Sequence, residues 1–252
     1  MNKEKALVLK FGGSGATTIE GANVEYLTSF LSSLVDVFSQ YERIGLIIGG
    51  GPRIRSLQKT VNTDYEKNMI AREALWEHAE QLLDVIIELG LEAVPVIPHS
   101  IDEAIQIINL QLGKVVVLSW LKEGQSTDAS AIFLADEWQF QGYEATIVIL
   151  SNVTHIFTSD PKIDPQAKSI QSSNVKALVE QNILVDDPLA FKPGMNVTID
   201  PVAVAHLLEM EDNAPKIFFG DYKDAESVRA FLLGLVPQNG TILSTQCVKT
   251  IY

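Results

Sequence analysis

A lysine and three glycines follow the first apolar segment of the chain, in the sequence ALVLKFGGSGATT (residues 6–18). Residues 6–10 are short, aliphatic and closed by glycines, which predicts a buried β-strand. Apolar residues then recur at helical spacing over 23–39, so a helix is expected next. A glycine turn between a strand and a helix can bring free backbone N–H groups to an anion, and Lys10 would add a positive charge. The segment fits a phosphate site, and it equally fits a plain turn whose glycines serve only geometry.

A second apolar segment also ends in glycines and is followed by arginines, in the sequence LIIGGGPRIR (residues 46–55). Its aliphatic residues predict a strand that closes at Gly49–Gly51. Arg53 and Arg55 follow within four residues of the last glycine. Strand ends of one open α/β sheet can meet at its carboxyl edge, where ligands of such sheets bind. Two glycine segments of this kind, each beside a cation, favour phosphate binding over two simple turns.

A polar segment at the start of a predicted helix supplies a carboxylate, in the sequence GQSTDASAIFLA (residues 124–135). Ser126 or Thr127 can cap this helix. Asp128 lies in the first turn, where the helix dipole favours a negative charge. These residue types are ordinary for a helix start. The functional interpretation is that Asp128 orients the lysine, or a metal, beside bound phosphates.

A fourth segment joins a strand to a proline-containing loop, in the sequence LSNVTHIFTSDPK (residues 150–162). Asp160 and Lys162 lie in this loop and could form the edge of a nucleotide pocket. A hydrated turn after a strand explains them as well. Loops over such sheets often carry function, so the segment is a candidate part of the site.

Composition and charge exclude several classes of protein. The chain has 32 acidic and 19 basic residues, a net charge of −13. A basic nucleic-acid-binding surface is therefore not expected. No apolar run approaches the ~20 residues of a membrane helix, and no signal peptide is apparent, so neither a membrane partner nor export is expected. Cys247 is the only cysteine, which rules out intrachain disulfides and favours a reducing cytoplasm.

Strand-like and helical segments alternate along the chain. Strands are expected at 6–10, 44–48, 92–97, 114–119, 146–150 and 216–219. Helices are expected at 23–39, 66–89, 101–111, 128–137, 200–209 and 224–234. This alternation predicts an α/β protein, a three-layer α/β/α sandwich around a mostly parallel central sheet. Two segments rich in turn residues, 158–172 and 186–198, are expected to be loops.

The four segments, in this order, resemble the amino acid kinase superfamily, and most of all its UMP kinases. LVLKFGGS is similar to the first glycine loop of that family, IIGGGPRIR to its triple-glycine segment, and STDASAIFLA to its Thr-Thr-Asp-Ala helix start. SNVTHIFTSDPKIDPQAK resembles its nucleotide loop, and IDPVAVAHLL and NGTIL its late helix and last strand. The resemblance covers nearly the whole chain. It implies one carbamate kinase-like domain over 1–252, with an acceptor lobe to about 142 and a nucleotide lobe from 143.

The resemblance also implies an activity, which is ATP-dependent phosphoryl transfer to a small phosphate-bearing acceptor, UMP to UDP first of all. Mg²⁺ would be held mainly by the nucleotide phosphates, and no residue is assigned as a metal ligand. The four histidines show no close metal-ligand spacing. The partners implied are small molecules and further copies of the chain, with a hexamer as the expected assembly.

Individual roles follow from the same resemblance. Lys10 would contact the transferring phosphoryl group and Asp128 would orient that lysine, so these two are the expected catalytic residues. The expected ATP-binding residues are Lys10, Gly12, Gly13, Gly51, Arg55, Ser151, Phe157, Asp160 and Lys162. The expected acceptor-binding residues are Gly50, Arg53, Arg55, Asp64, Arg72 and Thr127.

The chain departs from the UMP kinase pattern at a few positions. Thr154 and His155 replace an Asp-Gly pair of the nucleotide loop, and Ala205 replaces a lysine of the archaeal-type enzymes. The segment GGGPRIR resembles molybdenum storage proteins at least as much. A non-catalytic, ATP-binding homologue that stores molybdate or tungstate is therefore an alternative, and a kinase of another small acid is a further one.

The predicted helix 66–89 also bears on assembly. Its apolar residues are Trp76, Leu82, Leu83, Val85, Ile86 and Ile87. They offer more apolar surface than a helix that covers a core on one side needs. This favours contact with another copy of the chain, unless a neighbouring helix of the same chain covers the second face.

Overall fold

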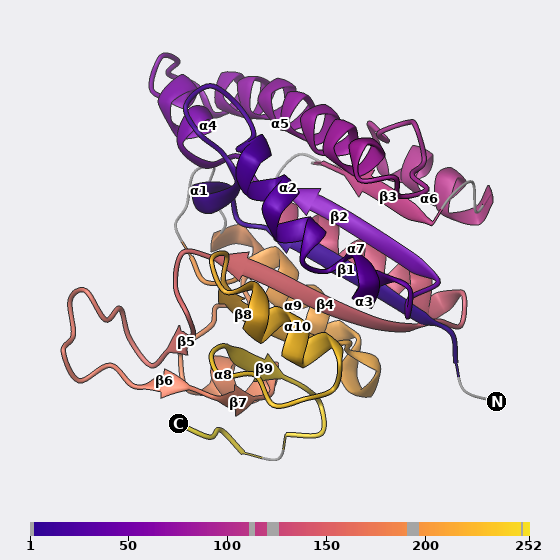
Figure 1. The fold of residues 1–252 in the computed structure, drawn as a ribbon. Coiled ribbons are helices and arrows are strands. Elements are labelled where there is room, and N and C mark those ends of the chain that lie inside the picture. Colours follow the sequence, from indigo (N-terminus) through magenta and orange to yellow (C-terminus); the bar gives the residue numbers. More distant parts are fainter. Residues whose placement is uncertain (1–2, 111–113, 120–125, 191–196, 248) are drawn as a thin grey trace.

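A seven-stranded sheet forms the centre of the computed structural model, which describes residues 3–110, 114–119, 126–190, 197–247 and 249–252. The order of its strands is β3-β2-β1-β4-β8-β9-β7. The bounds are β1 Lys5–Phe11, β2 Arg43–Ile48, β3 Val115–Leu118, β4 Glu144–Ser151, β7 Ser172–Ser173, β8 Lys216–Asp221 and β9 Thr241–Leu243. Only β8 and β9 pair antiparallel, so the expected mostly parallel sheet is confirmed (Figure 1).

The central strands alternate their side chains between two cores. In β1, Ala6 and Val8 enter one apolar cluster, whereas Leu7, Leu9 and Phe11 enter the other. This follows from the strand period of two, by which successive side chains point to opposite faces. Both faces are apolar because a parallel sheet is covered on both sides.

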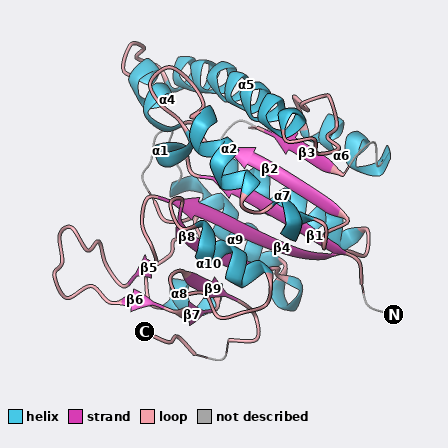
Figure 2. Cartoon of the chain, viewed as in Figure 1, coloured by secondary structure: helices cyan, strands magenta, loops and turns pink. Residues whose placement is uncertain are grey.

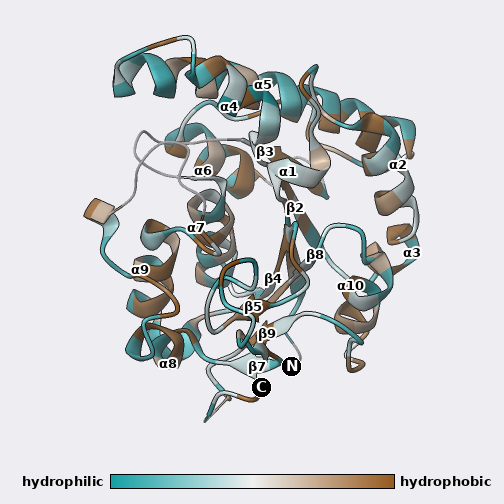
Figure 3. Ribbon diagram, turned by 90° about the vertical axis from the view of Figure 1, so that its left-hand side faces the viewer, coloured by the Kyte–Doolittle hydropathy of each residue, from teal (hydrophilic) through white to brown (hydrophobic). Residues whose placement is uncertain are grey.

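Helices cover the two faces of the sheet, which gives the three layers seen edge-on in Figure 3. One face carries α6 (Ile101–Leu110), α7 (Thr127–Phe140), α8 (Val175–Glu180) and α9 (Pro201–Glu209). The other face carries α2 (Val24–Ser32), α3 (Val35–Phe38), α5 (Asp64–Glu88) and α10 (Ala225–Leu232). Figure 2 shows the same helices against the strands. The predicted three-layer sandwich is therefore confirmed. None of the helices in the described ranges is long and apolar enough to cross a bilayer.

Short elements complete the chain. They are α1 (Gly13–Ala16), α4 (Gly51–Gln58), the two-stranded hairpin of β5 (Ile156–Phe157) and β6 (Ser169–Ile170), and the 3-10 turns Pro188–Ala190 and Glu211–Asn213. The hairpin and β7 lie at or beside the expected loop 158–172. Of the other expected loop, 186–198, residues 191–196 lie outside the described part of the chain. Residue 111 of the helix expected at 101–111, and residues 124 and 125 before α7, also lie outside it.

Two predicted elements differ from the structure. The strand expected at 92–97 is wrong, because only Ala93 forms an isolated parallel bridge, to Val115. Pro95 lacks an N–H to extend the ladder. The helix expected at 23–39 is two helices, α2 and α3, and the break falls at Ser33. The Ser33 hydroxyl donates to the carbonyl of Phe30, a local bond that competes with helix continuation.

Most of the apolar side chains of α5 pack against other parts of the same chain. Leu82, Leu83, Val85 and Ile86 are buried, while Ile87 stays 55% exposed. Trp76 stacks on His99, with ring centroids 4.1 Å apart, and the Arg72 guanidinium lies over its ring. Neighbouring elements of the same chain therefore explain most of the pattern. The oligomer remains a prediction that rests on the resemblance.

Candidate functional site

The two glycine loops touch at the carboxyl edge of the sheet, as expected. The Gly12 N–H donates to Leu150 O on β4 at 2.8 Å, and the Gly49 N–H donates to Phe11 O on β1 at 2.9 Å. A Cβ on Gly13 would lie only 2.1 Å from the Gly51 nitrogen. The backbones of the two loops are thus in direct contact, which only residues without side chains allow.

Gly51 holds the second loop in a conformation that favours glycine. Its φ is +62°, in the left-handed region. A Cβ there would meet the Thr17 hydroxyl at 2.0 Å and the Gly13 carbonyl at 2.1 Å. The Thr17 hydroxyl donates to Gly13 O at 2.6 Å, which ties the end of α1 to the first loop. The position therefore needs glycine for both its dihedral angle and its space.

A cavity of about 180 Å³ lies at the meeting point of the loops. Of the residues expected at the site, those that line it are Lys10, Gly12, Gly13, Gly50, Gly51, Arg55, Thr127, Asp128 and Ser151. Residues from four segments far apart in sequence are thus brought together. The cavity is small and polar, and its lining combines the glycines of both loops with the charged side chains of Lys10, Arg55, Asp128 and Asp200.

Lys10 and Asp128 form an ion pair inside this cavity. The Lys10 Nζ lies 2.5 Å from Asp128 Oδ1, and the two side chains are 13% and 9% exposed. Lys10 stands near the end of β1, and Asp128 lies in the first turn of α7. Ser126 caps α7 by accepting from the Asp128 N–H at 2.9 Å. The helix start and the strand end together fix the ammonium at the mouth of the glycine loops.

The two arginines of α4 take different positions. Arg55 lines the cavity and donates to the Ser14 hydroxyl at 3.4 Å. Arg53 forms an ion pair with Glu77 on α5 and is not among the described lining residues. One cation of the pair is therefore available to an anion in the cavity, and the other joins α4 to α5.

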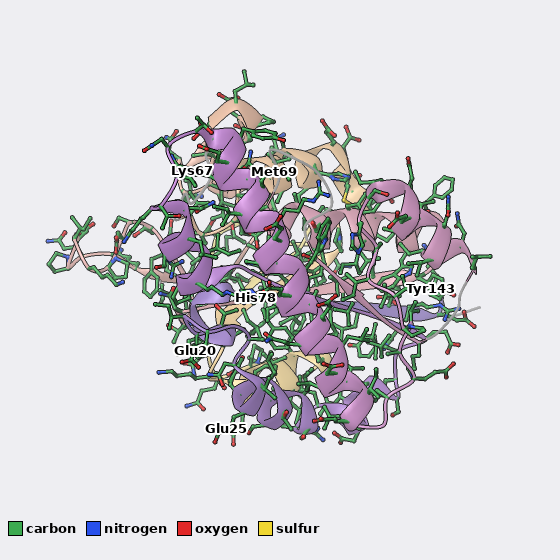
Figure 4. The ribbon with its side chains drawn as sticks, turned by 90° about the horizontal axis from the view of Figure 1, so that it is seen from above. Glu20, Glu25, Lys67, Met69, His78 and Tyr143 are labelled. Carbon is green, nitrogen blue, oxygen red and sulfur yellow. The ribbon has the colours of Figure 1, made fainter. Side chains whose placement is uncertain are left out.

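Two further residues expected at the acceptor lie along α5, away from the described cavity. Asp64 begins the helix and pairs with Lys67 at 3.5 Å. The Arg72 guanidinium covers the Trp76 ring, 4.4 Å from its centroid. Figure 4 looks down on α5 and labels Lys67 and Met69 near its start and His78 further along. Neither Asp64 nor Arg72 is among the described residues that line the cavity.

The expected nucleotide loop forms the β5–β6 hairpin and its tip. Phe157 lies in β5, edge-on to the His155 ring. Asp160 and Lys162 are exposed at the tip, where Asp160 Oδ1 accepts from the Lys162 N–H at 2.9 Å. None of the three is among the described residues that line the cavity. In Figure 1 the hairpin extends outward from the carboxyl side of the sheet.

His155, where the family pattern has a glycine, is buried in the body of the protein. Its Nε2 accepts the Gly240 N–H at 3.2 Å, and its Nδ1 lies 3.0 Å from the Thr154 hydroxyl. The neutral ring therefore carries its proton on Nδ1. Burial lowers the pKa of His155, which keeps that neutral form. The larger side chain connects the expected nucleotide loop to Gly240, just before β9, and is not part of the described cavity lining.

Some lining residues are not among those that the sequence assigned to the site. They are Ser14, Gly49, Ser126, Ile149, Leu150, Asn152, Val197, Thr198 and Asp200. Asp200 is 1% exposed and caps α9. Burial and the neighbouring Asp128 carboxylate raise the pKa of Asp200. The signal in the sequence was the Asp-Pro pair before a helical pattern, since aspartate at the cap and proline in the first turn mark a helix start.

His78, fully buried on α5 behind the triple-glycine loop, is expected to make stability depend on pH. Burial, and secondly Arg53, lowers the pKa of His78 from 6.5 to about 4. The unfolded chain then binds more protons between these values, so stability is full above about pH 6.5 and is lost as pH falls toward 4. The loss is about 3 kcal/mol.

Urea unfolding at a series of pH values checks this expectation. His78→Leu should remove most of the acid loss in the free energy of unfolding. His99→Gln, at an exposed histidine, should retain it. An unchanged pH dependence in His78→Leu would show that His78 does not carry the effect.

The protein is an α/β protein with a small polar cavity at the carboxyl ends of its strands, the place where ligands of open α/β sheets bind. The sequence profile of the amino acid kinase family matches residues 5–205. The chain therefore belongs to the amino acid kinase family, which supports its assignment as a kinase.

Curated relatives agree with this family. A uridylate kinase of Methanococcus maripaludis is 23% identical over 197 residues, which cover 78% of this chain and 83% of the relative. A uridylate kinase of Thermococcus kodakarensis is 27% identical over 177 residues, covering 69% and 74%.

Solved structures show the same fold. The uridylate kinase of Archaeoglobus fulgidus has a TM-score of 0.73 at 24% identity and covers 94% of this chain and 99% of its own. The UMP kinase of Bacillus anthracis has a TM-score of 0.73 at 19% identity and covers 100% of both chains.

Proposed function

We propose that the chain transfers a phosphoryl group from ATP to a small phosphate-bearing acceptor, with UMP as the acceptor and UDP as the product. The observation that carries this proposal is the Lys10–Asp128 pair where two bare-backbone loops meet. The uridylate kinases among the relatives and structural neighbours support UMP as the first acceptor to test.

The geometry suits phosphoryl transfer, which depends on positioning and charge neutralisation more than on covalent chemistry. Gly12 and Gly13 line the cavity where phosphate oxygens of the donor would bind, and Gly50 would lie against the acceptor phosphate. The Lys10 ammonium would neutralise charge that builds on the oxygens during transfer. Arg55, which donates to the Ser14 hydroxyl, would add a second cation beside the first glycine loop. A protein with a net charge of −13 has no diffuse positive field to do this instead.

Two lobes would divide the binding, with residues 1–142 holding the acceptor and 143–252 the nucleotide. Asp64, Arg72 and Thr127 would face the acceptor, and Arg53 would support them through α5. Ser151, Phe157, Asp160 and Lys162 would face ATP. The lobes share one sheet, since β1 and β4 pair in parallel from Lys5 to Phe11. The cavity takes lining residues from both expected lobes, so the site would lie between them.

The chain's own residues do not form a metal centre in the part of the chain that the structure describes. No group of three histidine, cysteine, aspartate or glutamate residues gathers there to hold a metal. Of the two cavity carboxylates, Asp128 is already paired with Lys10. Mg²⁺ favours phosphate oxygens and water, so it would enter bound to the nucleotide.

A measurement of ADP release tests the proposal. Purified protein is mixed with ATP and UMP, other nucleoside monophosphates or small acids, with and without Mg²⁺. Release of ADP that depends on UMP supports the proposal, and release that depends on another acid identifies another acceptor. If no acceptor supports turnover while ATP and molybdate or tungstate both bind, the storage alternative replaces it.

A further inference from the structure

Asp200 lies at the candidate site but has no role in the phosphoryl transfer proposed above. It caps α9, where its Oδ1 accepts the Val202 and Ala203 N–H groups at 2.7 and 3.1 Å. It is 1% exposed and lines the same cavity as Lys10 and Asp128. An ordinary cap needs only the first oxygen, so the second is free for another role.

That second oxygen and the Asp200 backbone reach the start of α7. Asp200 Oδ2 accepts the Ser126 hydroxyl, and the Asp200 N–H donates to Asp128 Oδ2 at 3.4 Å. Ser126 in turn accepts the Asp128 N–H at 2.9 Å. Asp128 is thus held at its backbone and at one side-chain oxygen, and the other oxygen faces Lys10.

We propose that Asp200 is a positioning residue: through Ser126 and its own backbone N–H it fixes Asp128, so that Asp128 presents Oδ1 to the Lys10 ammonium. The inference deepens the proposed phosphoryl transfer and rests on it. The contact between Asp128 and Asp200 would also connect the two expected lobes. Asp128 belongs to the segment before residue 142, and Asp200 belongs to the segment after it.

The electrostatics of the cavity agree with this role. The charged side chains that line it are Lys10 on β1, Arg55 on α4, Asp128 on α7 and Asp200 on α9. Burial and the Asp128 carboxylate both raise the pKa of Asp200. A carboxyl that is buried beside a second carboxylate takes up a proton at a higher pH than an exposed one. An amide at position 200 would remove this titrating group from the cavity.

Asp200→Asn tests the proposal, because asparagine is a good helix cap but lacks the charge. We expect kcat at neutral pH to fall by on the order of tenfold to a hundredfold, the loss that misplacement of a reacting group produces. KM for ATP should change by less than about twofold, since the glycine loops are intact. The acid limb of the kcat profile should move to lower pH, because the Asp200 carboxyl, whose pKa is raised, no longer titrates. Loss of a cap alone would not cause this move.

Asp224→Asn is the matched control. Asp224 caps α10 with the same chemistry, since it accepts the Ser227 N–H and hydroxyl at 2.9 and 2.8 Å. It is not among the described cavity residues. This variant should keep the wild-type kcat and pH profile. An unchanged kcat in Asp200→Asn, or a loss without a shift of the acid limb, would overturn the proposal.

A second variant and a second measurement cover the cases in which Asp200→Asn does not fold or the wild-type protein is inactive. If Asp200→Asn does not fold, Asp200→Ser retains a cap and is judged by the same criteria. If wild-type protein transfers no phosphoryl group, the proposed function fails, and the coupling is tested without turnover by urea unfolding. Because the folded pKa of Asp200 is raised, Asp200 contributes a loss of stability as pH rises above about 3.8. The free energy of unfolding of wild type minus that of Asp200→Asn should therefore fall over this range. Identical pH dependence in the two proteins would overturn the inference.

Discussion

Replacing Lys10 by alanine is expected to lower kcat by about 10²- to 10³-fold, the typical loss when one preorganised charge is removed from a transition state. The Lys10 ammonium lies 2.5 Å from Asp128 Oδ1 and is 13% exposed, at the meeting point of the glycine loops. No other described residue of β1 lines the cavity. The chain should still fold, because the side chain stands at a strand end and contributes little to either apolar core.

Two companion variants sharpen the measurement. Lys10→Arg should also fail, because a planar guanidinium does not replace a compact ammonium in a small cavity. Lys10→Ala leaves Asp128 unpaired, so the double variant Lys10→Ala/Asp128→Asn separates lost catalysis from the stability cost of a buried charge. The readouts are kcat, KM for ATP and the melting temperature. Turnover of Lys10→Ala at the wild-type rate would remove Lys10 from the mechanism.

The central strands could be predicted from the sequence because their environment is uniform. Residues 6–9 and 147–150 are aliphatic on both faces. The strands expected at 6–10 and 146–150 lie within the observed strands β1 and β4. The glycines that close β1 and β2 also marked the carboxyl edge, because backbone contact there leaves no room for a Cβ. In these segments local pattern and tertiary contact give the same answer.

Where the structure differs from the prediction, contacts between residues far apart in sequence determine the local structure. Residues 92–97 are apolar enough for a strand, but Pro95 limits the pairing to a bridge at Ala93. The hairpin of β5 and β6 was expected as a loop. It forms because the Thr241 hydroxyl accepts the Ile156 N–H and donates to Ile170 O, bonds from a residue more than 70 positions away.

Helix geometry explains why only one arginine reached the cavity. Both were assigned to ligand binding while the helix α4 was not recognised. Residues two positions apart on a helix point in different directions, so Arg53 and Arg55 cannot share a target. Pro52 in the first turn was the signal for that helix. Asp200 was missed for a related reason, since its contacts are with Ser126 and Asp128, some 70 residues earlier.

Gly51→Ala is expected to have the second large effect, on stability as well as on turnover. The left-handed φ of +62° costs a residue with a Cβ about 1–2 kcal/mol. The new Cβ would also lie 2.1 Å from the Gly13 carbonyl, so one backbone loop must move. Such overpacking costs about 1–3 kcal/mol more. Because either loop carries the candidate phosphate contacts, the folded fraction of this variant should also lose phosphoryl transfer.

Gly90→Ala is the control that separates the two causes. Gly90 has a φ of +71°, but a Cβ there would meet no atom within 4 Å. It should therefore lose only the conformational part, about 1–2 kcal/mol, and keep full activity. The free energies of unfolding in urea and kcat are measured for both variants. If Gly51→Ala were no less stable than Gly90→Ala and equally active, the two glycine loops would not be in contact. The site would then have to be rebuilt without the close approach that places Lys10 against bare backbone.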